Sequence, residues 1–265
     1  MPALPAGNTA APTPLDDAQL LRYSRHILLD ELGPGAQERF AAAHALVVGM
    51  GGLGAPAAQF LASAGVGTLT ICDADHVDLT NLQRQILYAT GDIGAPKVDA
   101  AARRIAAINP DVRVARVAAR VGPAELAPLV AAADVVLDCS DNFATRHAVN
   151  AACVAARRPL VSGAALRFDG QVAVFDPRAA DSPCYHCLFG EGEELEETRC
   201  ATMGVFAPLV GIVGSTQAAE ALKLIAGVGT SLAGRLLLVD ARTMEWRSLK
   251  VPRDPACPVC ARRPG

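Results

Sequence analysis

A glycine-rich loop between a short apolar run and an apolar helix constrains the fold of this chain more than any other feature. Within LVVGMGGLGAPAAQFLASAGVGTLTICDAD, residues 46–75, the glycines Gly49, Gly51, Gly52 and Gly54 follow a run of aliphatic residues. Glycines at these positions allow a tight turn and let backbone N–H groups approach a phosphate at the start of the following helix. The segment therefore predicts a nucleotide-binding strand–loop–helix unit.

Short apolar runs alternate with helical segments along the first two thirds of the chain. Runs of this kind, bounded by glycine or polar residues, are typical of buried parallel strands. The alternation predicts an α/β fold with a doubly wound, Rossmann-like and mostly parallel sheet. Strands are expected at 44–49, 67–75, 112–117, 134–141 and 159–165, and helices at 53–63, 96–108 and 143–157.

The pattern changes after this alternating region. GQVAVFD (170–176), RLLLVD (235–240) and MEWRSLK (244–250) have strand character, and no crossover helix fits between the last two. We therefore expect antiparallel or mixed strands that extend the parallel sheet. The apolar stretch 205–229 contains a glutamate, a lysine and several glycines, so it predicts a buried helix rather than a membrane span.

The length and the apolar content suit one globular domain. Residues 1–15 are rich in proline and alanine and lack the basic start and apolar run of a secretory signal, so we expect a disordered tail. Residues 16–265 are expected to form a single nucleotide-binding domain, with a helix over 16–40 and a C-terminal segment pinned by the zinc site described below. The acidic run 191–198 is expected to be a solvated loop.

Charge and cysteine usage narrow the possible partners and the compartment. The formal net charge is −3, which implies no broad attraction to nucleic acid or to a membrane. Eight cysteines without a signal peptide point to the cytoplasm, where thiols stay reduced. Cys72, Cys139 and Cys153 lie in apolar patterns and are interpreted as buried small side chains.

Two CxxC pairs, Cys184/Cys187 and Cys257/Cys260, predict a metal site. Four thiolates complete a tetrahedral zinc and leave no coordination position open, so the predicted zinc is structural. His186, inside the first pair, is surplus to this set. The alternative is four reduced thiols without a metal.

Polar side chains follow two of the expected strands, where ligands bind in doubly wound sheets. Asp73 and Asp75 end one strand and suit ribose hydroxyls. Asp141 and the neighbouring Asn142 follow another strand, and a carboxylate beside a triphosphate is a natural Mg²⁺ ligand. Asp138, at the end of that strand, suits either a magnesium ligand or a structural cap.

The cationic residues beyond the predicted ribose site separate two functions. Asn81, Arg84 and Lys97 suit a triphosphate better than a neutral dihydronicotinamide ring, although either cation alone also suits an ordinary surface position. An NAD-dependent oxidoreductase is the alternative that the glycine loop and Asp73 leave open. A third hypothesis is a non-catalytic adaptor that binds a ubiquitin-like partner.

The motifs RYSRH, GMGGLG, DADHVDLTNLQRQ, GAPK, DCSDN, GAALRFDGQ, CYHC and CPVC occur in this order. Together they resemble the ThiF/MoeB/HesA adenylyltransferases, bacterial relatives of ubiquitin-activating enzymes, over roughly residues 18–260. The resemblance is strongest to the molybdopterin branch, and the thiamine branch is the alternative. It implies that ATP adenylylates the C-terminal Gly-Gly carboxylate of a small ubiquitin-like sulfur carrier protein, releasing pyrophosphate before a thiocarboxylate forms.

The resemblance also implies roles for individual residues and for the cofactors ATP, Mg²⁺ and Zn²⁺. Arg25 corresponds to an arginine donated across a homodimer interface, and Cys200 to a cysteine that can link covalently to the carrier or the sulfur donor. Some relatives carry a C-terminal sulfurtransferase-like domain. This sequence stops soon after Cys260, so we expect the sulfur to come from a separate donor protein. The implied nucleotide-binding residues, besides the four glycines and Asp73, are Thr80, Asn81, Leu82, Gln83, Arg84, Lys97, Asp141 and Asn142.

Overall fold

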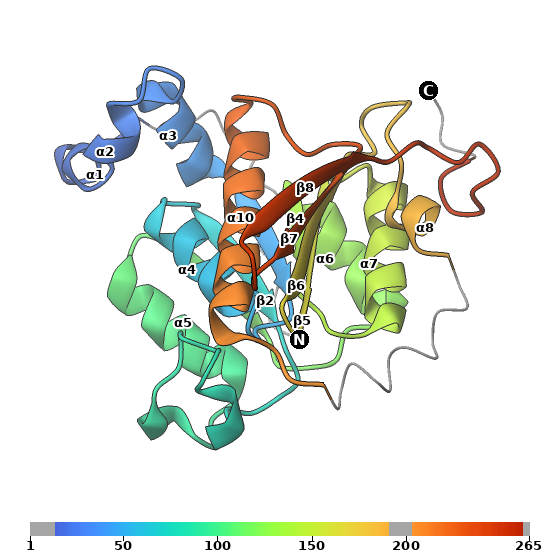
Figure 1. The fold of residues 1–265 in the computed structure, drawn as a ribbon. Coiled ribbons are helices and arrows are strands. Elements are labelled where there is room, and N and C mark those ends of the chain that lie inside the picture. The colour runs from blue at the N-terminus through green and yellow to red at the C-terminus, as the bar shows by residue number, and fades with distance from the viewer. Residues whose placement is uncertain (1–13, 191–202, 262–265) are drawn as a thin grey trace.

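One eight-stranded sheet, in the order β3-β2-β1-β4-β5-β6-β7-β8, forms the centre of the molecule (Figure 1). The computed structural model describes residues 14–190 and 203–261. Neighbouring strands from β3 to β5 are parallel, and those from β5 to β8 are antiparallel. The predicted fold class, a mostly parallel sheet with an antiparallel extension, is therefore confirmed.

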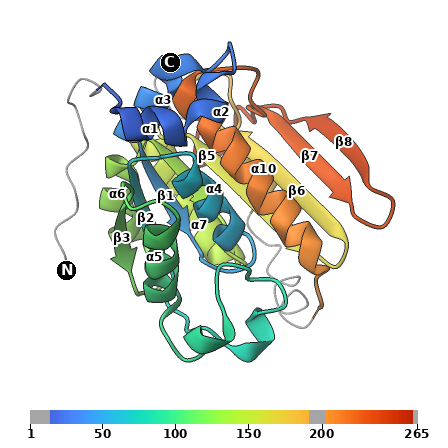
Figure 2. The same cartoon turned by 90° about the vertical axis from the view of Figure 1, so that its left-hand side faces the viewer.

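The parallel half of the sheet is covered by helices on both faces (Figure 2). Every residue of β1, β2 and β4 is buried, which explains their unbroken apolar sequences. One face carries α4, α5 and α10, and the other carries α6 and α7. The bounds are β1 His44–Val48, β2 Thr68–Cys72, β3 Arg113–Val117, β4 Val135–Asp138, β5 Leu160–Leu166, α4 Gly54–Ser63, α5 Lys97–Ile108, α6 Pro123–Ala132 and α7 Phe143–Ala156.

Helix α10, Ala207–Ala226, packs against α4 and strands β4, β5 and β6 (Figure 1). Its Gly214 allows this approach, because a Cβ there would lie 2.3 Å from the carbonyl oxygen of Leu53. Gln217, fully buried, donates from Nε2 to the carbonyl oxygens of Asp138 at 2.8 Å and Val161 at 3.1 Å. By length and composition α10 could cross a membrane, but these contacts make it a core helix, as predicted.

The antiparallel strands are β6 Asp169–Phe175, β7 Arg235–Asp240 and β8 Glu245–Lys250. The side chains of β8 are exposed along its whole length, so this strand forms the open edge of the sheet. The shorter helices are η1 Leu79–Asn81, η2 Thr90–Asp92 and α8 Tyr185–Leu188.

The expected single helix over 16–40 is wrong. The chain forms α1 Asp17–Arg22, α2 Ser24–Ile27 and α3 Gly33–Ala42 instead. Gly33 has a positive φ of 59°, and Pro34 lacks the N–H that would continue a helix, so a new helix begins there. Helix α6 was not predicted, and Pro128 inside it conceals its helical pattern. Residues 1–13 of the predicted tail, the acidic run 191–198 and Cys200 lie outside the described residues.

Candidate active site

The strand order places a ligand-binding crevice at the carboxyl ends of β1 and β4. From β1 the chain builds β2 and β3 on one side of the sheet and then crosses to β4 and β5 on the other. Open α/β sheets bind ligands where the strand order reverses in this way. The glycine loop follows β1, Asp73 follows β2, and Asp141 follows β4, so the predicted ligand residues surround this switch point.

The glycines of the loop serve two different purposes. Gly49 has a φ of +93°, and a Cβ on Gly54 would lie 1.9 Å from the carbonyl oxygen of Gly49, so both positions are fixed by the turn itself. A Cβ on Gly52 would lie 3.1 Å from a methyl group of Val210. A Cβ on Gly51 would meet only the Gln85 amide, at an ordinary 3.6 Å. Gly51 therefore leaves open space in front of the loop rather than relieving a contact.

This difference predicts that one alanine substitution lowers stability and the other lowers nucleotide affinity. Gly54→Ala should destabilise the fold by more than about 3 kcal/mol, because backbone atoms cannot move aside as a side chain can. Gly51→Ala should leave thermal unfolding nearly unchanged and weaken nucleotide binding, because only the open space is filled. Thermal denaturation and calorimetric titration with MgATP measure both effects. Equal melting temperatures for the two variants would contradict this assignment.

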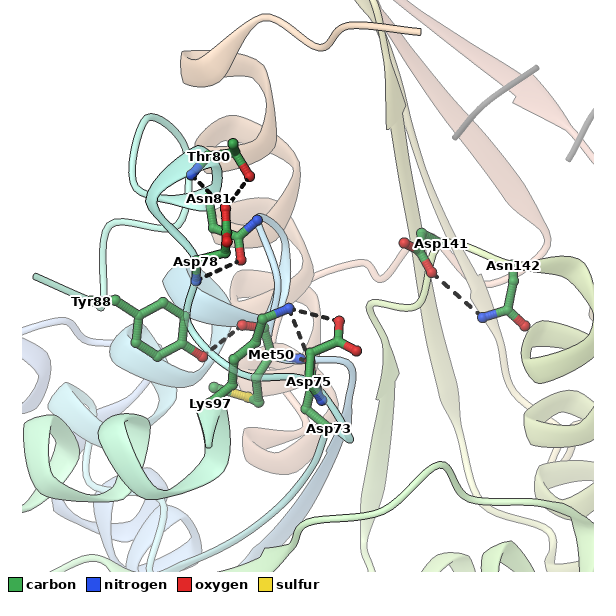
Figure 3. Close-up of polar contacts among 10 residues, drawn as sticks. All are labelled: Met50, Asp73, Asp75, Asp78, Thr80, Asn81, Tyr88, Lys97, Asp141 and Asn142. Atoms are coloured by element: carbon green, nitrogen blue, oxygen red, sulfur yellow. Dashed lines mark hydrogen bonds and ion pairs between the residues drawn. The ribbon is translucent and has the colours of Figure 1, made fainter. Parts of the chain in front are cut away.

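Asp73 connects the glycine loop to the second strand. Its Oδ2 accepts the backbone N–H of Met50 at 2.7 Å, and its Oδ1 accepts that of Asp75 at 2.8 Å (Figure 3). Burial raises the pKa of the Asp73 carboxyl above its ordinary value, and the Lys97 cation with the two N–H donors opposes part of that rise. The carboxylate is thus held at the end of β2 in a position that suits ribose hydroxyls.

Lys97 is a buried cation shared by two carboxylates. Its Nζ lies 3.0 Å from Oδ2 of Asp75 and 3.9 Å from Oδ2 of Asp73, and its side chain is 6% exposed. The backbone N–H of Lys97 also donates to the carbonyl of Asp75 at 2.9 Å, which fixes the start of α5 against the end of β2. A lysine held this way is a preorganised positive charge rather than a surface residue. The structure therefore favours the functional interpretation of Lys97.

The residues from 78 to 84 form a capped turn beside the glycine loop. Oδ1 of Asp78 accepts the N–H and the hydroxyl of Thr80 at 2.8 and 2.6 Å, and Oδ1 of Asn81 accepts the N–H of Asp78 at 3.4 Å (Figure 3). Leu82 packs against the core, so its side chain is structural. Thr80 and Asn81 thus have partners within the turn.

Arg84 and Gln83 face a hollow between this turn and two helices. The hollow has a volume of about 250 Å³, and its other lining residues are Ile86, Pro56 of α4 and three residues at the start of α10. The Arg84 guanidinium donates to the carbonyl of Thr80 at 3.0 Å, so it is not joined to the Asp73–Lys97 group. None of the ion pairs among the described residues includes Arg84, so no carboxylate in that part of the chain neutralises it.

Asp141, which follows β4, lies across from the Asp73–Lys97 group (Figure 3). Asp141 is exposed, and Asn142 donates to it at 3.5 Å while accepting the N–H of Thr145 at 2.9 Å as the cap of α7. Asp138 is fully buried and accepts the N–H and hydroxyl of Ser140 at 3.0 and 2.6 Å, which favours a structural role. The exposed carboxylate of Asp141 is the better placed of the two for a metal ion.

Arg25 is not brought to this site. It is exposed on α2, two residues after Tyr23. The Tyr23 hydroxyl accepts a hydrogen bond from Nδ2 of Asn109 at 2.8 Å, and the Tyr23 ring lies against Gly65. Both contacts lie at the amino ends of β2 and β3, whereas the glycine loop lies at the carboxyl end of β1. Arg25 therefore stands at the opposite end of the sheet from its predicted ligand within one chain.

The four cysteines of the predicted metal site form one cluster. Their sulfur atoms all lie within 4.8 Å of one another, with Sγ–Sγ distances of 3.7 Å between Cys184 and Cys257, 3.9 Å between Cys184 and Cys187, and 3.5 Å between Cys187 and Cys260. Sulfur atoms about 2.3 Å from a tetrahedral zinc lie about 3.8 Å apart, so the donor set fits zinc, whereas a disulfide needs about 2.05 Å. His186 packs edge-on against His147 instead, as its surplus position predicted.

Several residues of the site could not be identified from sequence. The Tyr88 hydroxyl donates to the carbonyl of Met50 at 2.7 Å and so holds the glycine loop in place. Gln217, on α10, joins the end of β4 to the start of β5. The sequence signal for Gln217 is the glycine that it packs against. A Cβ on Gly163 would lie 2.4 Å from the Gln217 amide, so a larger residue would not fit there.

The fold and these residues define an α/β nucleotide-binding protein whose glycine loop, carboxylates and buried lysine meet at the switch point of the sheet. The chain matches the ThiF family over residues 23–259 and belongs to that family. It is 47% identical over 249 residues to the molybdopterin-synthase adenylyltransferase of Escherichia coli K12, covering 93% of this chain and 98% of that protein.

Two further comparisons agree with this assignment. The chain is 46% identical over 246 residues to the sulfur carrier protein ThiS adenylyltransferase of Escherichia coli K12, covering 93% of this chain and 97% of that protein. The crystal structure of E. coli MccB with ATP superposes with a TM-score of 0.80 at 24% identity, covering 91% of this chain and 74% of that one. At this identity the structural match supports the fold alone.

Proposed function

We propose that this protein uses ATP to adenylylate the C-terminal glycine carboxylate of a small ubiquitin-like sulfur carrier protein. The family and the names of the relatives support the reaction class. The observation that carries the proposal is the buried Lys97 ammonium, held by Asp73 and Asp75 beside the glycine loop. A carrier of the molybdopterin-synthase type is the first candidate, and a thiamine-pathway carrier is the second.

The proposed chemistry needs no general base, because the carrier carboxylate is already ionised at neutral pH. Its oxygen attacks the α-phosphorus of ATP, the bond to the bridging oxygen breaks, and pyrophosphate leaves with the electron pair. Alignment and charge neutralisation then supply the rate enhancement. Asp73 holds the ribose, the glycine loop the phosphates, and Lys97 and Arg84 the developing negative charge.

We also propose two metal ions, Mg²⁺ and Zn²⁺. Mg²⁺ would neutralise charge on the phosphates, and the oxygen donors of Asp141 and Asn142 would hold it. Zn²⁺ fits the four-cysteine cluster as a structural ion that ties the C-terminal segment to the loop after β6. We place the reaction in the cytoplasm, since the cysteines among the described residues form no disulfides. The separate sulfur donor remains part of the proposal.

Carrier-dependent ATP–pyrophosphate exchange tests the proposal. A panel of purified carriers ending in Gly-Gly should include one that raises labelled pyrophosphate incorporation into ATP far above the rate without carrier. Deleting the last glycine of that carrier is the control, because it removes the nucleophile from its aligned position. Thermal stabilisation by NAD but not by MgATP, with no exchange for any carrier, would favour the oxidoreductase. Carrier binding without exchange would favour the adaptor.

From the family resemblance we also propose that the active unit is a homodimer in which Arg25, which lies away from the site within one chain, acts across the interface. Arg25→Ala and Lys97→Ala homodimers should both be inactive, whereas mixing and re-equilibrating them should recover about a quarter of wild-type activity, because half of the dimers are mixed and each has one complete site. Exchange assays before and after mixing measure this. No recovery in a mixture shown by mass to contain heterodimers would contradict the shared site.

A further inference from the structure

A buried asparagine contacts the four-cysteine cluster from outside. Asn150 lies in α7 and is 1% exposed. Its Nδ2 donates to Sγ of Cys184 at 3.6 Å, and its Oδ1 accepts the backbone N–H of Tyr185 at 2.9 Å. The N–H of Tyr185 requires an acceptor, so it fixes the orientation of the amide and points the Nδ2 donor at the sulfur.

The same face of α7 connects the cluster to the β4 end of the active site. Arg146, four residues before Asn150, donates from Nη2 to the carbonyl of Ser140 at 2.6 Å, and Asn142 caps the first turn of the helix. Four residues after Asn150, Val154 packs with the cluster cysteines. Residues four apart share one helix face, so these side chains form a continuous row along α7.

We propose that Asn150 is a positioning residue that orients Cys184 for the metal and anchors the cluster to α7. The inference rests on the proposed zinc site. Side chains that hydrogen-bond to metal ligands fix ligand orientation and contribute to metal affinity, although they do not touch the metal. Asn150 supplies such a bond to the Cys184 sulfur and also holds the backbone of the next residue, so it restrains the first CxxC turn at two atoms.

Metal competition on the full-length protein tests this proposal. Purified zinc-loaded wild type, Asn150→Asp and Asn150→Ala are titrated with a chromophoric zinc chelator under reducing conditions. Asn150→Asp keeps the acceptor for Tyr185 and replaces the donor that faces Cys184, whereas Asn150→Ala removes both. Both variants should hold zinc about 10–100-fold more weakly than the wild type. Should Asn150→Asp fail to fold, Asn150→Ala carries the test.

Asn109→Asp is the matched control. Asn109 is also a fully buried asparagine, and its Nδ2 donates to the Tyr23 hydroxyl and to the Ala62 carbonyl, each at 2.8 Å, far from the cysteines along the chain. The Asn109→Asp variant should retain wild-type zinc affinity even if the substitution lowers thermal stability. The thiolate-to-cobalt absorption band of the Co²⁺-substituted protein should shift in the Asn150 variants and not in this control.

The possible outcomes distinguish the role of Asn150 from the zinc site on which that role depends. Wild type that binds zinc tightly together with Asn150 variants that bind it equally well would overturn the role of Asn150 and leave the zinc site standing. Equal losses of affinity in Asn109→Asp would overturn it as well, because the effect would then follow from general destabilisation. Wild type without zinc would overturn the metal site itself and the role of Asn150 with it.

Discussion

Replacing Lys97 with alanine is expected to lower carrier-dependent ATP–pyrophosphate exchange about 10²–10³-fold with the fold intact, as removal of one preorganised charge-stabilising group typically does. The side chain is buried and pairs with two carboxylates, so its removal takes away the cation that they share. Arg103→Ala is the matched control, because Arg103 is an exposed cation on the same helix, 60% exposed and paired with Asp92. Near wild-type exchange by Lys97→Ala, or an equal loss in Arg103→Ala, would contradict the role of Lys97.

The same variant should also change the pH dependence of nucleotide binding. The Lys97 cation holds the pKa of Asp73 below the value that burial alone would give it. Removing this cation raises the pKa further, so the ionised carboxylate that accepts ribose hydroxyls is lost at a higher pH as the solution is acidified. Affinity for MgATP, measured by calorimetry between pH 8 and pH 5, should therefore decline earlier in Lys97→Ala than in the wild type.

Loss of the proposed zinc site is the second large effect. Cys257→Ser should lower the melting temperature by at least about 10 °C, because a structural zinc contributes its binding free energy to folding and each kcal/mol lost shifts the midpoint of a domain this size by about 2–4 °C. Cys257 is fully buried in the cluster, and the C-terminal segment packs around it. Thermal denaturation with parallel zinc analysis measures the effect.

Cys153→Ser is the control for this experiment. Cys153 is also buried, but it packs in the apolar core between α7 and the sheet, whereas Cys257 packs in the cysteine cluster. Its replacement should cost far less and should leave the zinc content unchanged. Melting temperatures that fall equally in the two variants, or a Cys257→Ser protein that retains zinc, would contradict a structural metal.

The sequence predicted the fold where local pattern and tertiary structure agree. The strand ending at Val48, the glycine loop and the helix after it follow from short apolar runs and the conformational needs of Gly49 and Gly54. The helix over 16–40 was wrong because its overall composition concealed a local break at Gly33 and Pro34. Local pattern therefore predicts where elements lie better than where they are interrupted.

For the candidate site, too, the sequence predicted some residues, and others became apparent only in the structure. Asp73 and Lys97 were predicted as ligand residues, but only the structure shows that a salt bridge joins them and that Arg84 lies apart from it. Asn150 and Gln217 were not predicted, because their roles depend on the approach of helices that are distant in sequence. A buried amide on a helix gives no periodic signal of its own, so such supporting residues become visible only in three dimensions.

Transfer of oxygen from the carrier to AMP tests the central claim most directly. A carrier labelled with ¹⁸O in its C-terminal carboxylate is incubated with the enzyme, MgATP and a thiol acceptor, and the AMP and pyrophosphate are analysed by mass spectrometry. Attack of the carboxylate on the α-phosphorus predicts one ¹⁸O atom in the phosphate of AMP and none in pyrophosphate. Release of unlabelled AMP, or of ADP in place of AMP and pyrophosphate, would contradict the account.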